Sequence, residues 1–458
     1  MKTNMDRRSF LKTSTAAGAG LSLTLSRMAP ILGAAAVPSL VHAAAGKPAL
    51  LGGTPVHTGG WTRWPQWREA WEPEVLQVYR SGKWFRGSDK HVDEFEVAYA
   101  NLLGATKCLA TASGTTALMV GLHVMDVDAG DEVIVSPYTF IATYNAILNA
   151  RALPVFADTD PATLTIDPAT IASRITERTR AIMPVHIFGM PCDMDPILAI
   201  ARQHKLAVVE DACQAWLAEY KGRKCGTLGD LGCFSFQESK HIPSGEGGAI
   251  TSLSEELIDK CDSFHNCGRA CGTNKGNGCF TRGGNYRMTQ AQAVILSQQI
   301  DKLVKETEIR RANADYLSAN LRQIPGITPM RLPENSRAVW HLYAMRYDAA
   351  QFNGLSREKF AQAVSAEGVP MAGGVYHEQY YDGLLDEAIA SRGFKRLWST
   401  ERLKAYRDSF QELKGNKQAC ETTVAISQNM LLADRGNTDQ IIEAVRKIQA
   451  NSAALAKA

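Results

Sequence analysis

Short runs of apolar and β-branched residues recur along the chain from about residue 105 onward. They are EVIVSP near 135, LPVFADTD near 155, RAIMPVHIFG near 185, LAVVEDAC near 209 and LGCFSF near 234. Segments with helical spacing of apolar positions, such as IASRITERT and MDPILAIARQH, separate most of these runs. Apolar strands that alternate with helices indicate βαβ units, so the pattern predicts a mainly parallel sheet covered by helices on both faces.

The pattern changes after Gly284. Thr289 and Gln292 have the spacing of a capping box, and helical periodicity then continues to about Leu321. Beyond this point SREKFAQAVSAEG and NTDQIIEAVRKIQA predict further helices among shorter strand signals. We therefore expect a large α/β domain with an N-terminal arm over residues 44–304, and a smaller α+β domain over residues 305–458.

The first 43 residues have a composition of their own. Arg7 and Arg8 precede an apolar stretch rich in small residues, and Val41-His42-Ala43 offers a cleavage site. These features are typical of a twin-arginine export signal over residues 1–43, which predicts a periplasmic protein. A disordered basic tail is the alternative.

Composition and charge argue against two classes of partner. The chain has 458 residues, of which 45% are hydrophobic and 21% charged, as in ordinary globular proteins with a large core. Residues 1–43 hold five of the 50 basic and one of the 47 acidic side chains, so the mature chain has a formal charge near −1. It shows neither the basic excess of nucleic-acid-binding proteins nor a membrane-binding polybasic run. No segment outside the signal reaches the ~18–20 apolar residues of a membrane span.

Four of the ten cysteines are clustered, at Cys261, Cys267, Cys271 and Cys279. Their spacing lacks the close pairs of structural zinc sites, so no metal site is predicted. We expect buried or loop thiols without a catalytic role, and the redox state of the cluster stays open.

A tryptophan-rich arm precedes the first predicted strand. In GWTRWPQWREAW, Trp61, Trp64, Trp67 and Trp71 are expected to pack on the core or across a subunit boundary rather than to stack on a ligand.

Candidate ligand-binding residues follow several of the predicted strands, and ligands of parallel α/β sheets bind at the carboxyl ends of strands. Ser113, Gly114 and Thr115 open a predicted helix whose N-terminus suits a phosphate group. Phe140 follows a strand and is suited to cover a flat heterocycle. His186 follows another strand and is a candidate for substrate contact, although a lone histidine is more often structural.

The same edge carries the residues with the strongest chemical implications. Asp211 should lie at a strand end, where a carboxylate needs a cationic partner, and Gln214 follows one helical turn later. Ser235 ends a strand, and Lys240 comes five residues after it, in SFQESKHIPSGEGG. This set fits pyridoxal phosphate, whose aldehyde forms a Schiff base with lysine and whose protonated ring nitrogen pairs with aspartate.

The stretches SGTTAL, SPYTFIAT, PVHIFG, VVEDACQA, SFQESKHIPSGEGG and GGNYRMTQAQA together resemble the DegT/DnrJ/StrS family of pyridoxal-phosphate aminotransferases, over roughly residues 50–450. The resemblance implies the aspartate-aminotransferase (type I) fold. It also implies a role for each of several residues: Lys240 as the Schiff-base lysine, Asp211 as the pyridinium partner, Phe140 as the stacking ring, and Gly114, Thr115 and Ser235 as phosphate ligands.

Two further residues are interpreted from the resemblance. Asn285, in GGNYRM, resembles the asparagine that reaches the phosphate of a neighbouring subunit, which implies a homodimer with a shared active site. Gln214 stands where many members have histidine, so its contribution near the ring is open. The WPQW arm, GKPALLGGTPV and ETTVAISQNMLLAD look closest to the cyclitol branch, such as L-glutamine:scyllo-inosose aminotransferases.

The predicted function is amino transfer from glutamate or glutamine to a keto-cyclitol or keto-sugar, with Lys240 also moving a proton. A sugar dehydratase or an aromatising synthase of the same fold is the first alternative. In the dehydratases histidine replaces the lysine; here His241 is adjacent, but Lys240 keeps the aminotransferase register. A non-catalytic binding protein on this scaffold is the second alternative. A nicotinamide enzyme is disfavoured because no G-x-G-x-x-G links a strand to a helix.

Overall fold

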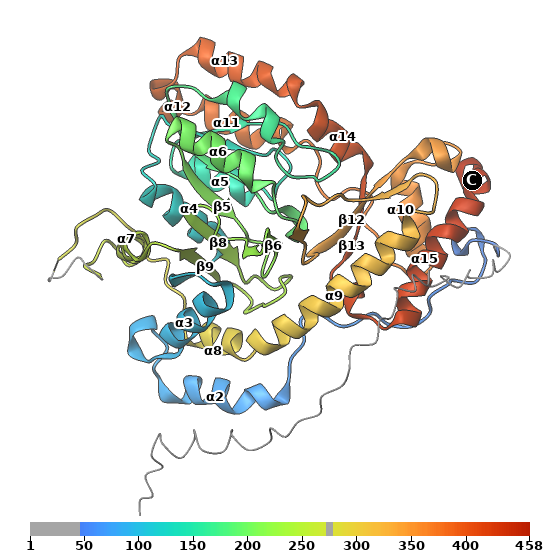
Figure 1. Cartoon of the computed structure of the whole chain (residues 1–458), viewed down its shortest axis with the longest axis horizontal. Helices are drawn as coiled ribbons and strands as arrows, with labels where there is room; N and C mark the ends of the chain where they lie inside the picture. Colours follow the sequence, from blue (N-terminus) through green and yellow to red (C-terminus); the bar gives the residue numbers. More distant parts are fainter. Residues whose placement is uncertain (1–45, 272–277) are drawn as a thin grey trace, which may run out of the picture. The chain divides into compact units, whose positions relative to one another are not determined.

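The structure is a computed structural model that describes residues 46–271 and 278–458 (Figure 1). The predicted export signal, residues 1–43, lies outside the described residues. The chain divides into a unit of Met1–Ala44 and a unit of Ala45–Ala458, and the second unit contains all the elements below.

The α-helices of the described residues are α2 (Glu72–Ser81), α3 (His91–Leu103), α4 (Gly114–Val124), α5 (Ala142–Asn149), α6 (Met194–His204), α7 (Glu255–His265), α8 (Gln290–Ser297), α9 (Ile300–Leu321), α10 (Arg357–Ala366), α11 (Gly383–Ala390), α12 (Arg392–Leu397), α13 (Thr400–Asp408), α14 (Lys414–Thr422), α15 (Arg435–Ala450) and α16 (Ser452–Lys457). The strands are β1 (Lys107–Thr111), β2 (Glu132–Val135), β3 (Leu153–Phe156), β4 (Thr179–Met183), β5 (Ala207–Asp211), β6 (Glu219–Tyr220), β7 (Arg223–Lys224), β8 (Leu231–Ser235), β9 (Gly248–Ser252), β10 (Ile327–Pro329), β11 (Ser336–Arg337), β12 (Leu342–Tyr347) and β13 (Thr423–Ser427).

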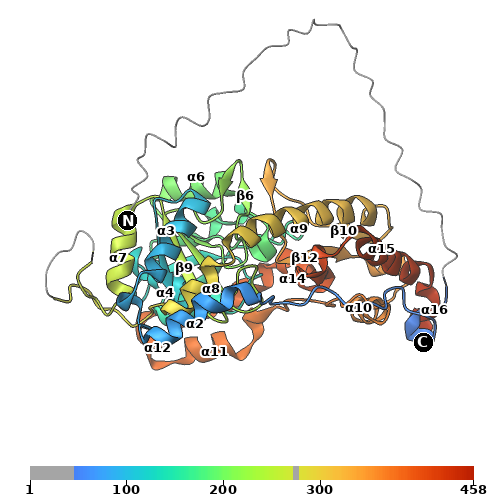
Figure 2. The same ribbon diagram turned by 90° about the horizontal axis from the view of Figure 1, so that it is seen from below.

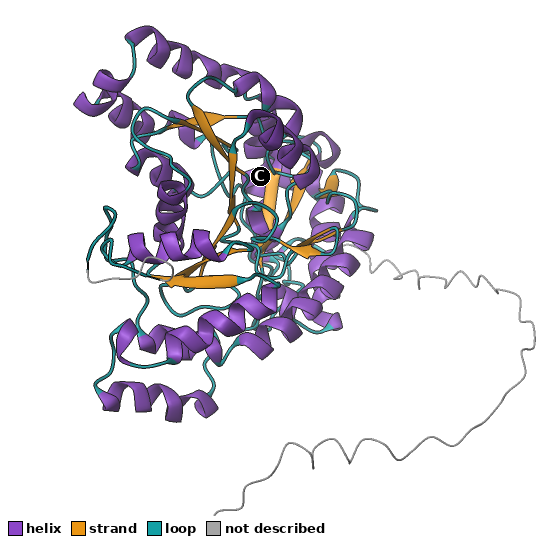
Figure 3. Ribbon diagram, turned by 60° about the vertical axis from the view of Figure 1, so that its left-hand side comes forward, coloured by secondary structure: helices purple, strands orange, loops and turns teal. Residues whose placement is uncertain are grey.

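A seven-stranded sheet with the order β1-β9-β8-β5-β4-β2-β3 forms the centre of the fold (Figure 3). Strands β8, β5, β4, β2 and β3 pair in parallel, and β9 runs antiparallel to both β1 and β8. Strands β2, β3, β8 and β9 are buried along their whole length, which explains why their sequences are mostly apolar rather than alternating. The prediction of a mainly parallel, helix-covered sheet is confirmed.

The predicted strands and most predicted helices are found where the sequence pattern put them. Helix α8 begins with the expected capping box, in which the Thr289 side chain accepts from the backbone of Gln292. The prediction of a helix over IASRITERT is wrong. That segment contains only the short 3-10 helix Ala172–Arg174, because the Thr176 hydroxyl donates to Glu132, 2.5 Å away, and strand β4 begins at Thr179.

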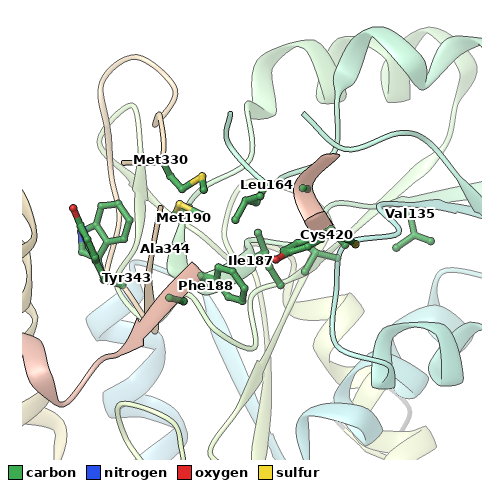
Figure 4. Close-up of a cluster of buried hydrophobic side chains, with 14 of the residues drawn as sticks. Val135, Leu164, Ile187, Phe188, Met190, Met330, Tyr343, Ala344 and Cys420 are labelled. Carbon is green, nitrogen blue, oxygen red and sulfur yellow. The ribbon is translucent and has the colours of Figure 1, made fainter. Parts of the chain in front are cut away.

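A second, three-stranded antiparallel sheet has the order β10-β12-β13. Helix α15 contacts both α9 and α10 beside this sheet. One continuous apolar core joins the two sheets. Figure 4 shows part of it, with Val135 of β2 and Tyr343 and Ala344 of β12 as members of the same cluster. The predicted division at residue 304 stays a prediction.

Residues 380–410 return to the large sheet although they lie between β12 and β13 of the second sheet in sequence. Phe156 of β3 lies within aromatic contact of Tyr380, Tyr406 and Phe410, with ring centroids 5.5–6.3 Å apart. Arg402 of α13 also pairs with the buried Glu132 of β2. The C-terminal part of the chain therefore contributes to the covering of both sheets.

The start of the described chain lies beside the C-terminal helices (Figure 2). The carboxylate of Glu367 accepts from the backbone N–H groups of Ala49 and Val56, at 2.8 and 3.0 Å, and from Lys447 of α15, at 2.8 Å. Lys447 also donates to the carbonyl of Thr54, 2.7 Å away. These bonds fix the start of the N-terminal arm on the C-terminal part of the chain.

Across the portions of the chain that the structure describes, no helix is both long and apolar enough to cross a membrane.

Candidate active site

A cavity of about 570 Å³ opens at the carboxyl ends of the parallel strands of the large sheet. Its size is within the range of small-molecule sites. Eight of the ten sequence-predicted residues line it: Ser113, Gly114, Thr115, Phe140, Asp211, Gln214, Ser235 and Lys240. The topology explains this convergence, because β5 and β8 end at this edge and α4 begins there.

The N-terminus of α4 forms one wall of the cavity. The Ser113 hydroxyl is used as the helix cap, accepting a hydrogen bond from the backbone of Thr116 at 3.1 Å. The first backbone N–H groups of a helix, here those of Gly114 and Thr115, have no acceptor within the helix and attract anions. A Cβ atom on Gly114 would lie 2.7 Å from Ser235 Cβ and 2.9 Å from Cys213 Sγ, so only glycine lets the helix start come this close to β8.

Asp211 ends strand β5 and is buried at the cavity. Its Oδ2 accepts a hydrogen bond from the Thr143 hydroxyl at 2.8 Å, and its Oδ1 accepts from the backbone N–H of Cys213 at 3.2 Å. Within residues 46–271 and 278–458, no lysine, arginine or histidine forms an ion pair with this carboxylate. A buried carboxylate of this kind can stabilise a positive charge that enters the cavity.

Lys240 lies in the turn between β8 and β9, and its side chain reaches the cavity. Burial lowers the pKa of its amine, while the nearby Cys213 and Asp211 act in the opposite direction. Its Nζ is 3.5 Å from His341 Nε2, and its carbonyl oxygen accepts a hydrogen bond from the Trp64 indole at 3.1 Å. The lowered pKa enlarges the fraction of neutral, nucleophilic amine at a given pH.

Phe140 and Tyr376 are two aromatic residues that line the same cavity. Phe140 is 57% exposed, an unusual exposure for a ring at a strand end, so a face of it is available to a flat ligand. Gln214 is held in place, because its Oε1 accepts from the backbone of Phe188 at 2.8 Å and its Nε2 donates to the Tyr376 hydroxyl at 3.3 Å. Burial raises the pKa of Tyr376 to about 12, so this hydroxyl stays protonated.

Two predicted residues lie outside the cavity. The ring of His186 is fully buried, with Nε2 2.8 Å from Glu210 and Nδ1 accepting from the backbone N–H of Cys192 at 3.0 Å. Both ring nitrogens are therefore occupied by the protein, which corrects the expectation that His186 contacts substrate. Asn285 is exposed and pairs with Asn266. Its expected role needs a second subunit and stays a prediction.

The clustered cysteines are free thiols in the structure. Cys261 is buried, Cys271 donates to the Asp262 carboxylate, and Cys267 and Cys279 are exposed. This agrees with the expectation of buried or loop thiols. The arm tryptophans also follow the packing interpretation in part, since Trp71 is buried whereas Trp67 is 52% exposed.

Sequence reasoning missed several cavity residues. Thr143 holds Asp211, His341 contacts Lys240, and Tyr376 contacts Gln214. His341 immediately precedes β12, and Tyr376 follows α10, so both come from the C-terminal part of the chain. Only Thr143, one helical turn after Phe140, lies near a predicted site residue in sequence.

The donor set fits pyridoxal phosphate. The free N–H groups at the start of α4 and the Ser235 hydroxyl suit the phosphate, and the close approach at Gly114 leaves no room for a Cβ. Asp211 suits a protonated ring nitrogen, Phe140 the ring face and Lys240 the aldehyde. Each of these protein groups therefore has a matching chemical group on pyridoxal phosphate.

Residues 65–391 match the profile of the DegT/DnrJ/EryC1/StrS aminotransferase family, and residues 4–24 match that of the twin-arginine translocation signal sequence. The chain is 33% identical over 425 residues to an L-glutamine:2-deoxy-scyllo-inosose aminotransferase of Streptomyces paromomycinus, covering 89% of this chain and 98% of that protein. An enzyme of the same name from Streptomyces lividus is 35% identical over 333 residues, covering 70% of this chain and 78% of that protein.

Solved structures show the same fold. A 3-amino-5-hydroxybenzoic acid synthase superposes with a TM-score of 0.75 at 26% identity, over 88% of this chain and 99% of that chain. An aminotransferase from Psychrobacter cryohalolentis gives a TM-score of 0.74 at 29% identity, over 86% and 99% of the two chains.

Proposed function

Since the chain belongs to the DegT/DnrJ/EryC1/StrS aminotransferase family, we propose that it transfers an amino group from glutamine or glutamate to a keto-cyclitol or keto-sugar. The observation that carries the proposal is the cavity in which Lys240 and the buried, cation-free Asp211 face the start of α4. The glutamine-dependent inosose aminotransferases, similar over most of their length, favour glutamine as donor and a cyclitol as acceptor.

We assign pyridoxal phosphate as the cofactor. When bound, it supplies an aldehyde and an electron-withdrawing ring for the chemistry of amino groups. Asp211 would accept a hydrogen bond from the ring nitrogen, Phe140 would cover the ring, and Gly114, Thr115 and Ser235 would donate hydrogen bonds to the phosphate. The amine of Lys240 would hold the aldehyde while no amino donor is bound, and as a free amine it would accept the proton from the α-carbon of the donor.

The remaining proposals concern the oligomeric state, the domain organisation and the cellular location. We propose a homodimer in which Asn285 reaches the site of the neighbouring subunit, and a periplasmic location after removal of residues 1–43. We also expect a large domain over residues 44–304 and a smaller domain over residues 305–458. Because nucleotide-linked sugars belong to the cytoplasm, export favours a free cyclitol or sugar as the acceptor. N-terminal sequencing of the mature protein tests the cleavage site.

The first test is the visible absorption spectrum of the purified protein with pyridoxal phosphate, before and after L-glutamine or L-glutamate is added. We expect a yellow band that bleaches with an amino donor. Borohydride reduction followed by peptide mass spectrometry should locate the pyridoxyl group on Lys240, and Lys240→Ala should lack both signals. A folded protein that never develops the band would contradict the proposal.

An aromatising synthase is the alternative that one observation favours, namely the similarity of fold to 3-amino-5-hydroxybenzoic acid synthase. A band that forms but does not respond to either donor would support it. Turnover of an inosose with glutamine, followed by mass spectrometry of the aminated product, would exclude it as the main activity.

A further inference from the structure

His341 is the residue that contacts the amine of Lys240. Its Nε2 lies 3.5 Å from Lys240 Nζ, at the long end of hydrogen-bonding distance, and it lines the cavity beside the lysine. Its other ring nitrogen, Nδ1, is buried without a hydrogen-bond partner in the described parts of the chain. The protein therefore leaves this ring with a single polar contact, and that contact is to the lysine.

The surroundings fix the orientation of the ring. The Trp216 indole meets it edge-on, with centroids 5.7 Å apart and planes at 76°, and Trp216 is itself tied to the carbonyl of Ser235 by a 2.9 Å hydrogen bond. The backbone N–H of His341 donates to the carbonyl of Phe188 at 2.7 Å. An imidazole held in one orientation can fix the position of the terminal amine of a flexible lysine side chain.

The imidazole is held in its neutral form. Burial lowers the pKa of His341 well below its usual range, and the nearby Lys240 and Arg310 lower it further. The ring of His241 also faces it, with the two ring centroids 6.0 Å apart. A neutral ring offers an acceptor nitrogen, whereas an imidazolium would repel the ammonium form of Lys240.

We propose that His341 is a positioning residue for the reaction: its Nε2 accepts a hydrogen bond from the Lys240 amine and holds the amine at the cavity. The inference rests on the proposed function. Without this acceptor, the amine loses the hydrogen bond that holds it at this wall of the cavity.

The test compares His341→Phe, which fills the space without an acceptor, with His341→Gln, whose amide oxygen restores one. The full mature chain, freed of bound cofactor, is acetylated with acetic anhydride across a pH series, and labelling at Lys240 is followed by peptide mass spectrometry. Lys260, whose side chain is 51% exposed, serves as the internal reference. Circular dichroism checks the fold, and His341→Leu replaces the phenylalanine variant if that variant unfolds.

Because the acceptor stabilises the ammonium form, we expect the labelling midpoint of Lys240 to fall by about one pH unit in His341→Phe and to recover in His341→Gln. The Lys260 midpoint should stay constant. An unchanged Lys240 midpoint in His341→Phe, or an equal fall in both variants, would overturn the proposal. Since this readout needs no cofactor, it remains decisive even if the wild-type protein fails to bind pyridoxal phosphate.

Discussion

Glu210 and Asp211 are consecutive carboxylates on strand β5, and they face two different regions. Glu210 is fully buried and accepts hydrogen bonds from the backbone of Gly226, Leu228 and Gly229, each at 2.7 Å, and lies 2.8 Å from His186. Asp211 lies in the cavity and, among the described residues, accepts hydrogen bonds from the Thr143 hydroxyl and the backbone of Cys213. One carboxylate is saturated by the protein, whereas the other retains capacity for a ligand.

The same contrast holds for the histidines of the two regions. His186 uses both ring nitrogens within the protein, whereas His341 has one nitrogen towards Lys240 and one without a partner among the described residues. Burial alone therefore does not distinguish a structural polar group from a functional one. The number of unused hydrogen-bonding positions does.

Removing Lys240 is expected to give the largest difference between the cavity and the buried region around Glu210. We expect Lys240→Ala to lower kcat/KM by about 10⁴-fold or more, because the variant has neither the nucleophile nor the proton acceptor. Its free energy of unfolding should not fall, since the lost amine is desolvated in the folded state. Steady-state kinetics and urea denaturation measure the two effects, with Lys260→Ala as the surface control.

A matched pair of isosteric changes tests the carboxylates directly. Glu210→Gln should reduce the free energy of unfolding by about 3 kcal/mol, because the amide nitrogen cannot accept from the backbone donors of the 226–229 turn. Asp211→Asn should change stability by less than about 1 kcal/mol while lowering kcat about 100-fold, since a neutral amide stabilises a protonated ring nitrogen poorly. A large loss of stability in Asp211→Asn, together with a large loss of kcat in a stable Glu210→Gln variant, would refute the assignment of Asp211 to the cofactor and of Glu210 to the fold.

A smaller effect is expected at the start of α4. Gly114→Ala should weaken pyridoxal phosphate binding about tenfold, because its Cβ overlaps Ser235 and Cys213 and pushes the phosphate-binding N–H groups away. Gly121→Ala in the same helix is the control, since its Cβ would meet only side-chain atoms at 3.4 Å or more. Fluorescence titration with the cofactor measures both. Equal losses in the two variants would indicate a general effect on the helix.

The smallest effect concerns Phe140. Its ring is mostly exposed, so Phe140→Leu should leave stability nearly unchanged and reduce cofactor affinity about three- to tenfold through loss of ring stacking. Val97→Ala, at a 62% exposed position on α3, should alter neither quantity. Unchanged affinity in Phe140→Leu would place the cofactor ring elsewhere in the cavity.

The sequence predicts the parallel sheet and the cavity residues that directly follow its strands. Asp211 and Ser235 end buried parallel strands and Lys240 follows five residues after Ser235, so all three lie at the carboxyl edge of the sheet, where ligands bind. His186 misled the interpretation because side chains alternate along an extended chain. Val185 lines the cavity, so the next residue turns away from it.

What the sequence does not predict are contacts made across long chain separations. The Lys240–His341 contact joins residues 101 positions apart, and the Trp64–Lys240 bond joins residues 176 apart. No local periodicity specifies either pair. Both contacts depend on how the N-terminal arm and the second sheet pack against the large sheet.

The bonds of the N-terminal arm have a consequence for the order in which the protein is made. The ribosome delivers residues 49–56 early, yet their partners Glu367 and Lys447 come very late. A growing chain that has not reached α15 cannot fix the arm, and it therefore cannot seat Trp64 against the carbonyl of Lys240. Lys240 acquires its final backbone support only when synthesis is almost complete, which suits a protein that folds fully before it is exported.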